Sequence, residues 1–145
     1  LDAEGRIFPT NKKYAPHVLI FNGNIDFPSV GNRQAQVGDS IYFKTDLPRV
    51  HALAKYILAD DFASCCVRQV FYEKTRQKQY RSILFYLNNT DVCVVFGDDV
   101  DVEKKLEKMR RFFMRMQGNP EMENFSKINL NYNNQVVCTK INSYE

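Results

Sequence analysis

The chain has 145 residues, of which 44% are hydrophobic, with eleven Phe and eight Tyr. This length and composition predict one globular domain with a substantial core and exclude a disordered chain. The formal charge of +3, from 20 basic and 17 acidic side chains, is too balanced to indicate a nucleic-acid-binding protein by itself. No apolar run approaches the ~18 residues that cross a bilayer. The first residues show no signal-peptide pattern and no initiator Met, so we expect the chain to be part of a longer one.

The first 45 residues predict short strands and loops, with an apolar run at 18–21 and a turn at 22–24. A helix is expected next, with Asp46 as its N-cap and Pro48 in its first turn. Its apolar residues recur at intervals of three and four: Leu47, Val50, Leu53, Ala54, Ile57 and Leu58.

The middle of the chain predicts an antiparallel meander, because "CVRQVFYEK", "YRSILFYLN" and "DVCVVFG" are rich in β-branched and aromatic residues and are separated by polar clusters. A second helix follows, which Asp101 caps and which Gly118 and Pro120 end. Its apolar stripe is Val102, Leu106, Met109, Phe112, Phe113 and Met116.

The last two predicted strands, at about 126–132 and 135–141, form a hairpin about a two-residue turn at Asn133 and Asn134. Such a turn pairs Leu130 with Val137 and Asn129 with Cys138. The core face would then hold Ile128, Leu130, Tyr132 and Val137, and the outer face Asn129, Asn131, Val136 and Cys138. Together these elements predict an α+β fold, an antiparallel β-sheet with helices packed on one face and a terminal β-hairpin with an exposed edge strand.

The candidates for chemistry favour a protein that is not an enzyme and needs no cofactor. His17 and His51 lie far apart, and neither accompanies a Ser or Cys in a recognisable nucleophile context. Asp98, Asp99, Asp101 and Glu103 lack the pattern of a calcium loop and suit a helix N-terminus. Cys65, Cys66, Cys93 and Cys138 match no zinc spacing, although a disulfide between Cys93 and Cys138 is possible if their strands are neighbours.

The second helix carries a basic face that offers an alternative function, a small nucleic-acid- or lipid-surface-binding module around residues 103–116. Neutralising Lys104, Lys108 and Arg111 would abolish that binding. Charges opposite an apolar stripe are also ordinary for a surface helix, and no phosphate-binding loop accompanies them. The full basic set is Lys104, Lys105, Lys108, Arg110, Arg111 and Arg115.

The terminal hairpin is the feature that most favours a function, because an edge strand is a template for another chain. Val136 and Cys138 are uncharged where an idle edge strand often carries Lys or Pro. We therefore predict that a partner adds a strand here. A simple closing hairpin, covered by the final "INSYE", remains the alternative.

Several segments in this order resemble the FtsQ/DivIB family of bacterial cell-division proteins, closest to members from Bacteroidetes-like bacteria. They are "LDAEGRIFP", "YAPHVLIFNGN", "YILADDF", "VVFGDD" and "FSKINLNYNNQVVCTK". The resemblance covers nearly the whole chain. It implies that residues 1–145 are a single extracytoplasmic β domain of a non-enzymatic divisome protein, whose N-terminal membrane anchor and POTRA domain lie outside this sequence.

The same resemblance implies partners and a site. An FtsB-like protein, in complex with an FtsL-like protein, would add a strand to the last edge at the periplasmic face of the inner membrane. Asn131 stands where many members have arginine, which puts a charged contact in doubt. The partner-binding residues that it implies are Tyr132, Asn134, Gln135, Val136, Val137 and Cys138.

Overall fold

A computed structural model describes residues 2, 4–7, 18–26, 35–36, 45–74, 81–88 and 90–141. Six strands form the main sheet, in the order β2-β4-β5-β6-β7-β8. Their bounds are β2 (Ile20–Gly23), β4 (Val67–Lys74), β5 (Arg81–Leu87), β6 (Cys93–Gly97), β7 (Phe125–Asn129) and β8 (Val137–Lys140). The helices are α1 (Leu47–Ala59), α2 (Ala63–Cys66), α3 (Val102–Met116) and the 3-10 helix η2 (Pro120–Asn124). Two short strands, β1 (Arg6–Ile7) and β3 (Ala35–Gln36), form a separate antiparallel pair.

The sheet is mixed, so the expectation of a purely antiparallel sheet is wrong. The meander of β4, β5 and β6 is antiparallel as predicted. However, β2 pairs with β4, and β6 with β7, in parallel. The reason is that α1 lies between β2 and β4 in the chain, and α3 between β6 and β7. A parallel pair needs such a crossover, whereas a tight turn can only produce an antiparallel pair.

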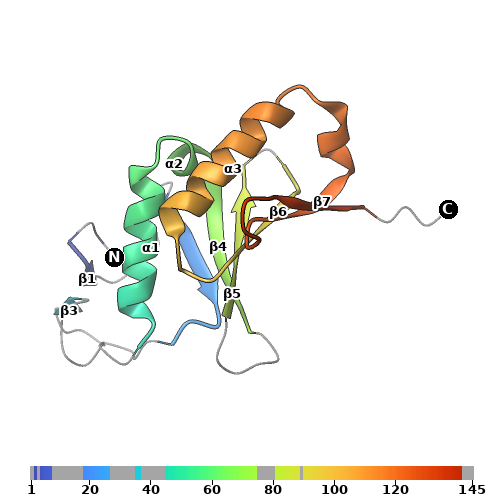
Figure 1. Cartoon of the computed structure of the whole chain (residues 1–145). Coiled ribbons are helices and arrows are strands. Elements are labelled where there is room, and N and C mark those ends of the chain that lie inside the picture. The colour runs from blue at the N-terminus through green and yellow to red at the C-terminus, as the bar shows by residue number, and fades with distance from the viewer. Residues whose placement is uncertain are drawn as a thin grey trace, which may run out of the picture.

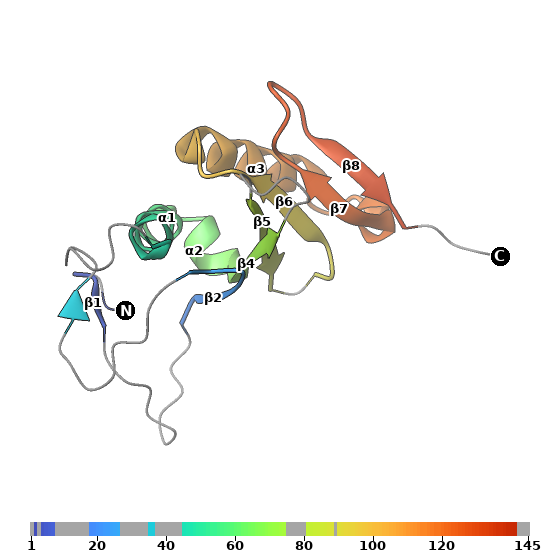
Figure 2. The same cartoon turned by 90° about the horizontal axis from the view of Figure 1, so that it is seen from below.

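Both long helices lie on the same face of the sheet, as the sequence predicted (Figures 1 and 2). The pairings make β2, β4, β6 and β7 run in one direction, and both crossovers step the same way along the sheet. A strand–helix–strand crossover between parallel strands is nearly always right-handed. Two crossovers with the same direction and the same hand must place their helices on the same face.

The core lies between this helical layer and the sheet. On the helices, the fully buried residues recur at the predicted spacing, as with Leu53 and Ile57 on α1 and Leu106 and Met109 on α3. On the strands they alternate, and the Phe85 and Phe96 rings stack at 4.6 Å between centroids. Burial of each such side chain contributes about 1.5–3 kcal/mol, so this layer supplies most of the stability.

The start of each long helix differs from the sequence-based expectation. Asp46 and Asp101 occupy the N-cap positions, but neither side chain accepts a capping hydrogen bond from its helix. The Asp46 carboxylate instead accepts a hydrogen bond from the Asp26 amide at 2.5 Å. Asp101 is in the left-handed conformation, at φ 53°.

Of the helices in the described ranges, none combines the length and the apolar character needed to cross a membrane.

The start of α3 is fixed by Lys105, a buried charged residue with 8% of its surface exposed. Its Nζ lies 2.7 Å from Asp98 Oδ1 and 3.0 Å from the Asp98 carbonyl oxygen, and 5.0 Å from the centroid of the Phe96 ring. Asp99 makes a bidentate ion pair with Arg49 of α1. These acidic residues therefore tie α3 to β6 and α1, and the described residues contain no cluster suited to a metal ion.

We predict that Asp98→Ala destabilises the domain more than Lys105→Met does. The first change leaves a buried ammonium without its carboxylate, which we expect to cost about 1–3 kcal/mol because Asp98 is partly exposed and its carbonyl still accepts a bond. The second change removes the charge and keeps an apolar stem against Phe96. Urea unfolding of the two variants tests the order, and equal losses would contradict it.

Candidate partner-binding site

The candidate site is the hairpin of β7 and β8 at one end of the sheet. β8 is the last strand in the order, and it pairs with β7 alone. Figures 1 and 2 place this hairpin at the end of the sheet remote from α1. Within the part of the chain that the structure describes, no strand pairs with the outer side of β8.

The register of the hairpin differs by one residue from the expected one. Ile128 lies opposite Cys138 and Asn129 opposite Val137, whereas the two-residue turn pairs Asn129 with Cys138. The strands are also shorter than expected, ending at Asn129 and starting at Val137, so that residues 130–136 connect them. Asn134 has the predicted positive φ, 57°, but it belongs to a longer connection.

This shift exchanges the two faces of β8, because neighbouring residues of a strand point to opposite sides. Val136 and Cys138, expected on the outer face, are half-buried against the core. Val137, expected in the core, is 39% exposed. Ile128 and Leu130 are fully buried as predicted, but Tyr132 is 48% exposed because it lies in the connection.

Hydrogen bonds at the end of β8 show which of its backbone groups face β7 and which face outward. The Ile141 amide donates to the Asn124 carbonyl at 2.7 Å, and the Thr139 carbonyl accepts from Ser126 Oγ at 3.3 Å. Residues 139 and 141 therefore direct their backbone groups toward β7 and its approach. Since the direction alternates, the amides and carbonyls of Cys138 and Lys140 point away from β7. Within the described part of the chain, these four groups form the free edge of the sheet.

The connection between the strands is anchored at its start. Leu130 is fully buried, and its amide donates to the Val95 carbonyl at 2.9 Å. Asn131 covers Gly97, which has a φ of 85°, and a Cβ at Gly97 would lie 2.5 Å from the Asn131 side chain. The connection therefore needs a glycine at position 97, at the end of β6.

Lys108 of α3 anchors the rest of the connection. Its Nζ donates to the carbonyl oxygens of Leu130 at 2.8 Å, Tyr132 at 2.6 Å and Gln135 at 3.5 Å. Burial, with a contribution from the charge of Lys105, lowers the pKa of Lys108. The structure thus uses within the chain a lysine that the sequence suggested for binding phosphate.

The six sequence-predicted site residues lie along one continuous segment but play different roles. Only Val137 and Cys138 belong to β8, and Val136 directly precedes it. Tyr132, Asn134 and Gln135 are exposed and belong to the connection. Sequence reasoning did not include Lys140, whose backbone faces the free edge. It assigned Lys108 to a phosphate-binding face, because the spacing of Lys108 on α3 is that of an ordinary surface residue.

The cysteines do not form the disulfide that was left open. All four are free, and Cys93 and Cys138 lie on β6 and β8, with β7 between them. Two sheet spacings amount to about 9–10 Å, beyond the ~7 Å limit for a disulfide, and the residues lie on opposite faces of the sheet. Burial raises the pKa of both thiols, which keeps them protonated and weakly nucleophilic at neutral pH.

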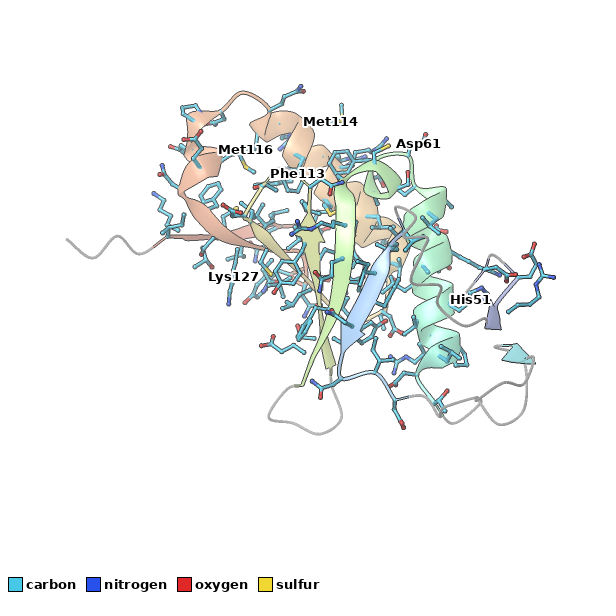
Figure 3. All side chains as sticks on the ribbon, turned by 180° about the vertical axis from the view of Figure 1, so that it is seen from behind. His51, Asp61, Phe113, Met114, Met116 and Lys127 are labelled. Atoms are coloured by element: carbon cyan, nitrogen blue, oxygen red, sulfur yellow. The ribbon has the colours of Figure 1, made fainter. Side chains whose placement is uncertain are left out.

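The other candidate residues are not brought together into a site. His51 lies on α1, at the end of the sheet opposite to the β7–β8 hairpin (Figure 3). His17 lies outside the described residues. On α3, Arg110 and Arg111 both pair with Glu107, at 3.8 and 2.8 Å. Lys105 and Lys108 are engaged as well, so four of the six basic side chains of α3 make contacts within the chain.

One protein-family model, described as FtsQ/DivIB, C-terminal related, matches residues 1–139 of this chain. The match includes the core strands, both long helices and β8 up to Thr139. No curated protein matches the sequence.

The backbone assignment of β8 predicts that Thr139→Pro destabilises the hairpin more than Lys140→Pro does. Proline removes an amide, and only the Thr139 amide faces β7, where Thr139 lies opposite Lys127. We expect an additional loss of about 1–3 kcal/mol in the free energy of unfolding for Thr139→Pro. Both side chains are exposed, so the difference in the free energy of unfolding by urea reports the loss of the two backbone amides. A larger loss for Lys140→Pro would show that the Lys140 amide, and not the Thr139 amide, faces β7.

The contact between Gly97 and Asn131 predicts that Gly97→Ala costs about 1–3 kcal/mol, from the left-handed conformation together with the clash. Asn131→Ala removes the two atoms nearest to position 97. In the Gly97→Ala background it should therefore restore only the stability lost to the clash, and not the part lost to the left-handed conformation. A double-mutant cycle by chemical unfolding measures this coupling, which we expect to be about 1 kcal/mol. Additive effects would show that the two side chains are independent.

Proposed function

Because the chain belongs to the FtsQ/DivIB C-terminal related family, we propose that this cell-division domain is a non-enzymatic scaffold that recruits or regulates membrane-bound division proteins through its β8 edge. A partner would add an extended strand alongside β8. The observation that carries the proposal is the free edge itself, at which the backbone groups of Cys138 and Lys140 point away from β7 at the end of the sheet.

The side chains of β8 support this use of the edge. Cys138 is uncharged and half-buried, and the exposed Val137 adds apolar surface on the opposite face. An idle edge strand is commonly protected by inward-pointing charges or proline. Here the inward position carries a thiol and only Lys140, at the end of β8, is charged. In strand addition, backbone hydrogen bonds supply affinity and alternate side chains supply specificity.

The family suggests the partners and the location. We propose that an FtsB-like protein provides the added strand and that an FtsL-like protein accompanies it. The domain would act at the periplasmic face of the inner membrane, held there by an anchor outside this sequence. Tyr132, Asn134 and Gln135 would contact the partner where its strand passes the end of the hairpin, since all three are exposed beside β8.

The alternative, a surface that binds nucleic acid or lipid through α3, has less support. Lys108 donates to three backbone carbonyls, and Lys105 is buried against Asp98. Glu107 lies between Arg110 and Arg111. Four of the six basic side chains that this function would use therefore already contact groups within the chain.

We predict that Lys140→Pro weakens binding of a peptide from the extracytoplasmic segment of the FtsB-like protein of the same organism by tenfold or more, about 1.4 kcal/mol. The proline removes an outward amide that a partner strand would use, while the ladder to β7 keeps its own amides. Isothermal titration calorimetry on the folded variants measures the affinity.

Lys140→Ala is the matched control, because it removes the same side chain and keeps the amide. Strand addition requires the proline to weaken binding more than the alanine does. Equal losses would show that the lysine side chain and not the backbone is recognised. No binding by the unchanged domain would remove the proposed partner.

A further inference from the structure

We propose that Lys108 is a positioning residue for the β8 edge, whose ammonium group holds the connection 130–136 in the conformation that presents β8 to a partner. The inference rests on the proposed function and deepens it. Lys108 lies on α3 and not on the edge itself, yet on this proposal it controls how well the edge binds.

The geometry is that of an ammonium group shared among converging carbonyls. Nζ of Lys108 lies 2.8, 2.6 and 3.5 Å from the carbonyl oxygens of Leu130, Tyr132 and Gln135. A protonated lysine has three N–H donors and no acceptor, so one side chain can serve all three oxygens. Hydrogen bonds from a charged donor are roughly twice as strong as neutral ones.

These contacts reach from the first residue of the connection to its last residue but one. Leu130 directly follows β7, and Gln135 lies two residues before Val137, where β8 begins. With its start anchored at Leu130 and the Gln135 carbonyl within 3.5 Å of Lys108 Nζ, the connection has little freedom to change its length along the strands. The bend at Tyr132 is held as well, and this residue is 48% exposed.

The consequence for binding is a lower ordering cost. A partner strand that pairs with β8 needs the edge residues in one register, and each loosely held residue adds an entropic cost on association. Replacing the ammonium with an apolar group leaves three carbonyls facing one another without a donor. We expect the connection then to sample other conformations, so that part of the binding free energy is spent on ordering it.

The charge of Lys108 can be separated from its contacts by a matched variant. Lys104 lies four residues earlier on α3, is exposed, and donates to none of these three carbonyls. Lys104→Met and Lys108→Met remove one positive charge each from the same helix. A long-range electrostatic role predicts similar effects, whereas positioning predicts an effect of Lys108 alone.

The experiment has two readouts on the wild-type domain, Lys108→Met and Lys104→Met. Hydrogen exchange followed by NMR reports the amides of residues 130–136 in the free domain, and calorimetry reports the affinity for the partner peptide described above. We expect Lys108→Met to accelerate exchange in 130–136 and to weaken binding about five- to twentyfold. Lys104→Met should leave both quantities within twofold of wild type. Lys108→Gln, which is polar and neutral, replaces Lys108→Met if that variant folds poorly. We expect it to change the exchange rates and the affinity in the same direction.

Three results would overturn the inference. The first is exchange in 130–136 that is unchanged in both Lys108 variants, and the second is accelerated exchange with unaltered affinity. Equal weakening by Lys104→Met and Lys108→Met would assign the effect to charge and overturn it too. If the wild-type domain binds no peptide, the proposed function fails together with the binding role of Lys108. The exchange rates then still decide whether Lys108 holds the connection.

Discussion

The direction of the two crossovers is the constraint on which the rest of the structure depends. Because β2 to β4 and β6 to β7 step the same way with the same hand, α1 and α3 lie on one face of the sheet. The second crossover also decides that β7 lies beyond β6, so the hairpin extends outward and its last strand becomes the edge. It brings α3 back over β7, within reach of the connection to β8, which is why Lys108 can bind the carbonyls there.

The elements themselves were largely predictable from the sequence, because each depends on a local pattern. Periods of three and four identified α1 and α3, and the apolar, β-branched strands identified the meander. The parallel pairs were missed although their cause was visible, since a helix between two strands permits them. The sequence does not state which strands become neighbours. That choice depends on packing helices such as α1 against Phe85 and Phe96, residues distant in the chain.

The hairpin that carries the candidate site was predicted at the right place in the chain but with the wrong register, for a physical reason. A pair of asparagines that tolerates positive φ favours a tight turn, and Asn134 does take that conformation. Two long-range contacts override the local preference: Leu130 is buried beside Val95, and Lys108 draws three carbonyls toward α3. The burial of Leu130 was predicted, but its bond to Val95 and the contacts of Lys108 leave no signal in the spacing of residues, so the inward position of Cys138 required the structure.

The length of β8 limits what backbone pairing alone can achieve. Cys138 and Lys140 offer two amides and two carbonyls to a partner. At about 0.5–1.5 kcal/mol net for each hydrogen bond, these groups supply about 2–6 kcal/mol before the costs of association. A dissociation constant of about 1 mM already requires about 4 kcal/mol. A specific partner must therefore bury side chains as well, and the exposed Tyr132 and Val137 are the apolar groups beside the edge that can supply this energy. The edge would set the register of the complex, while these two side chains would set its strength.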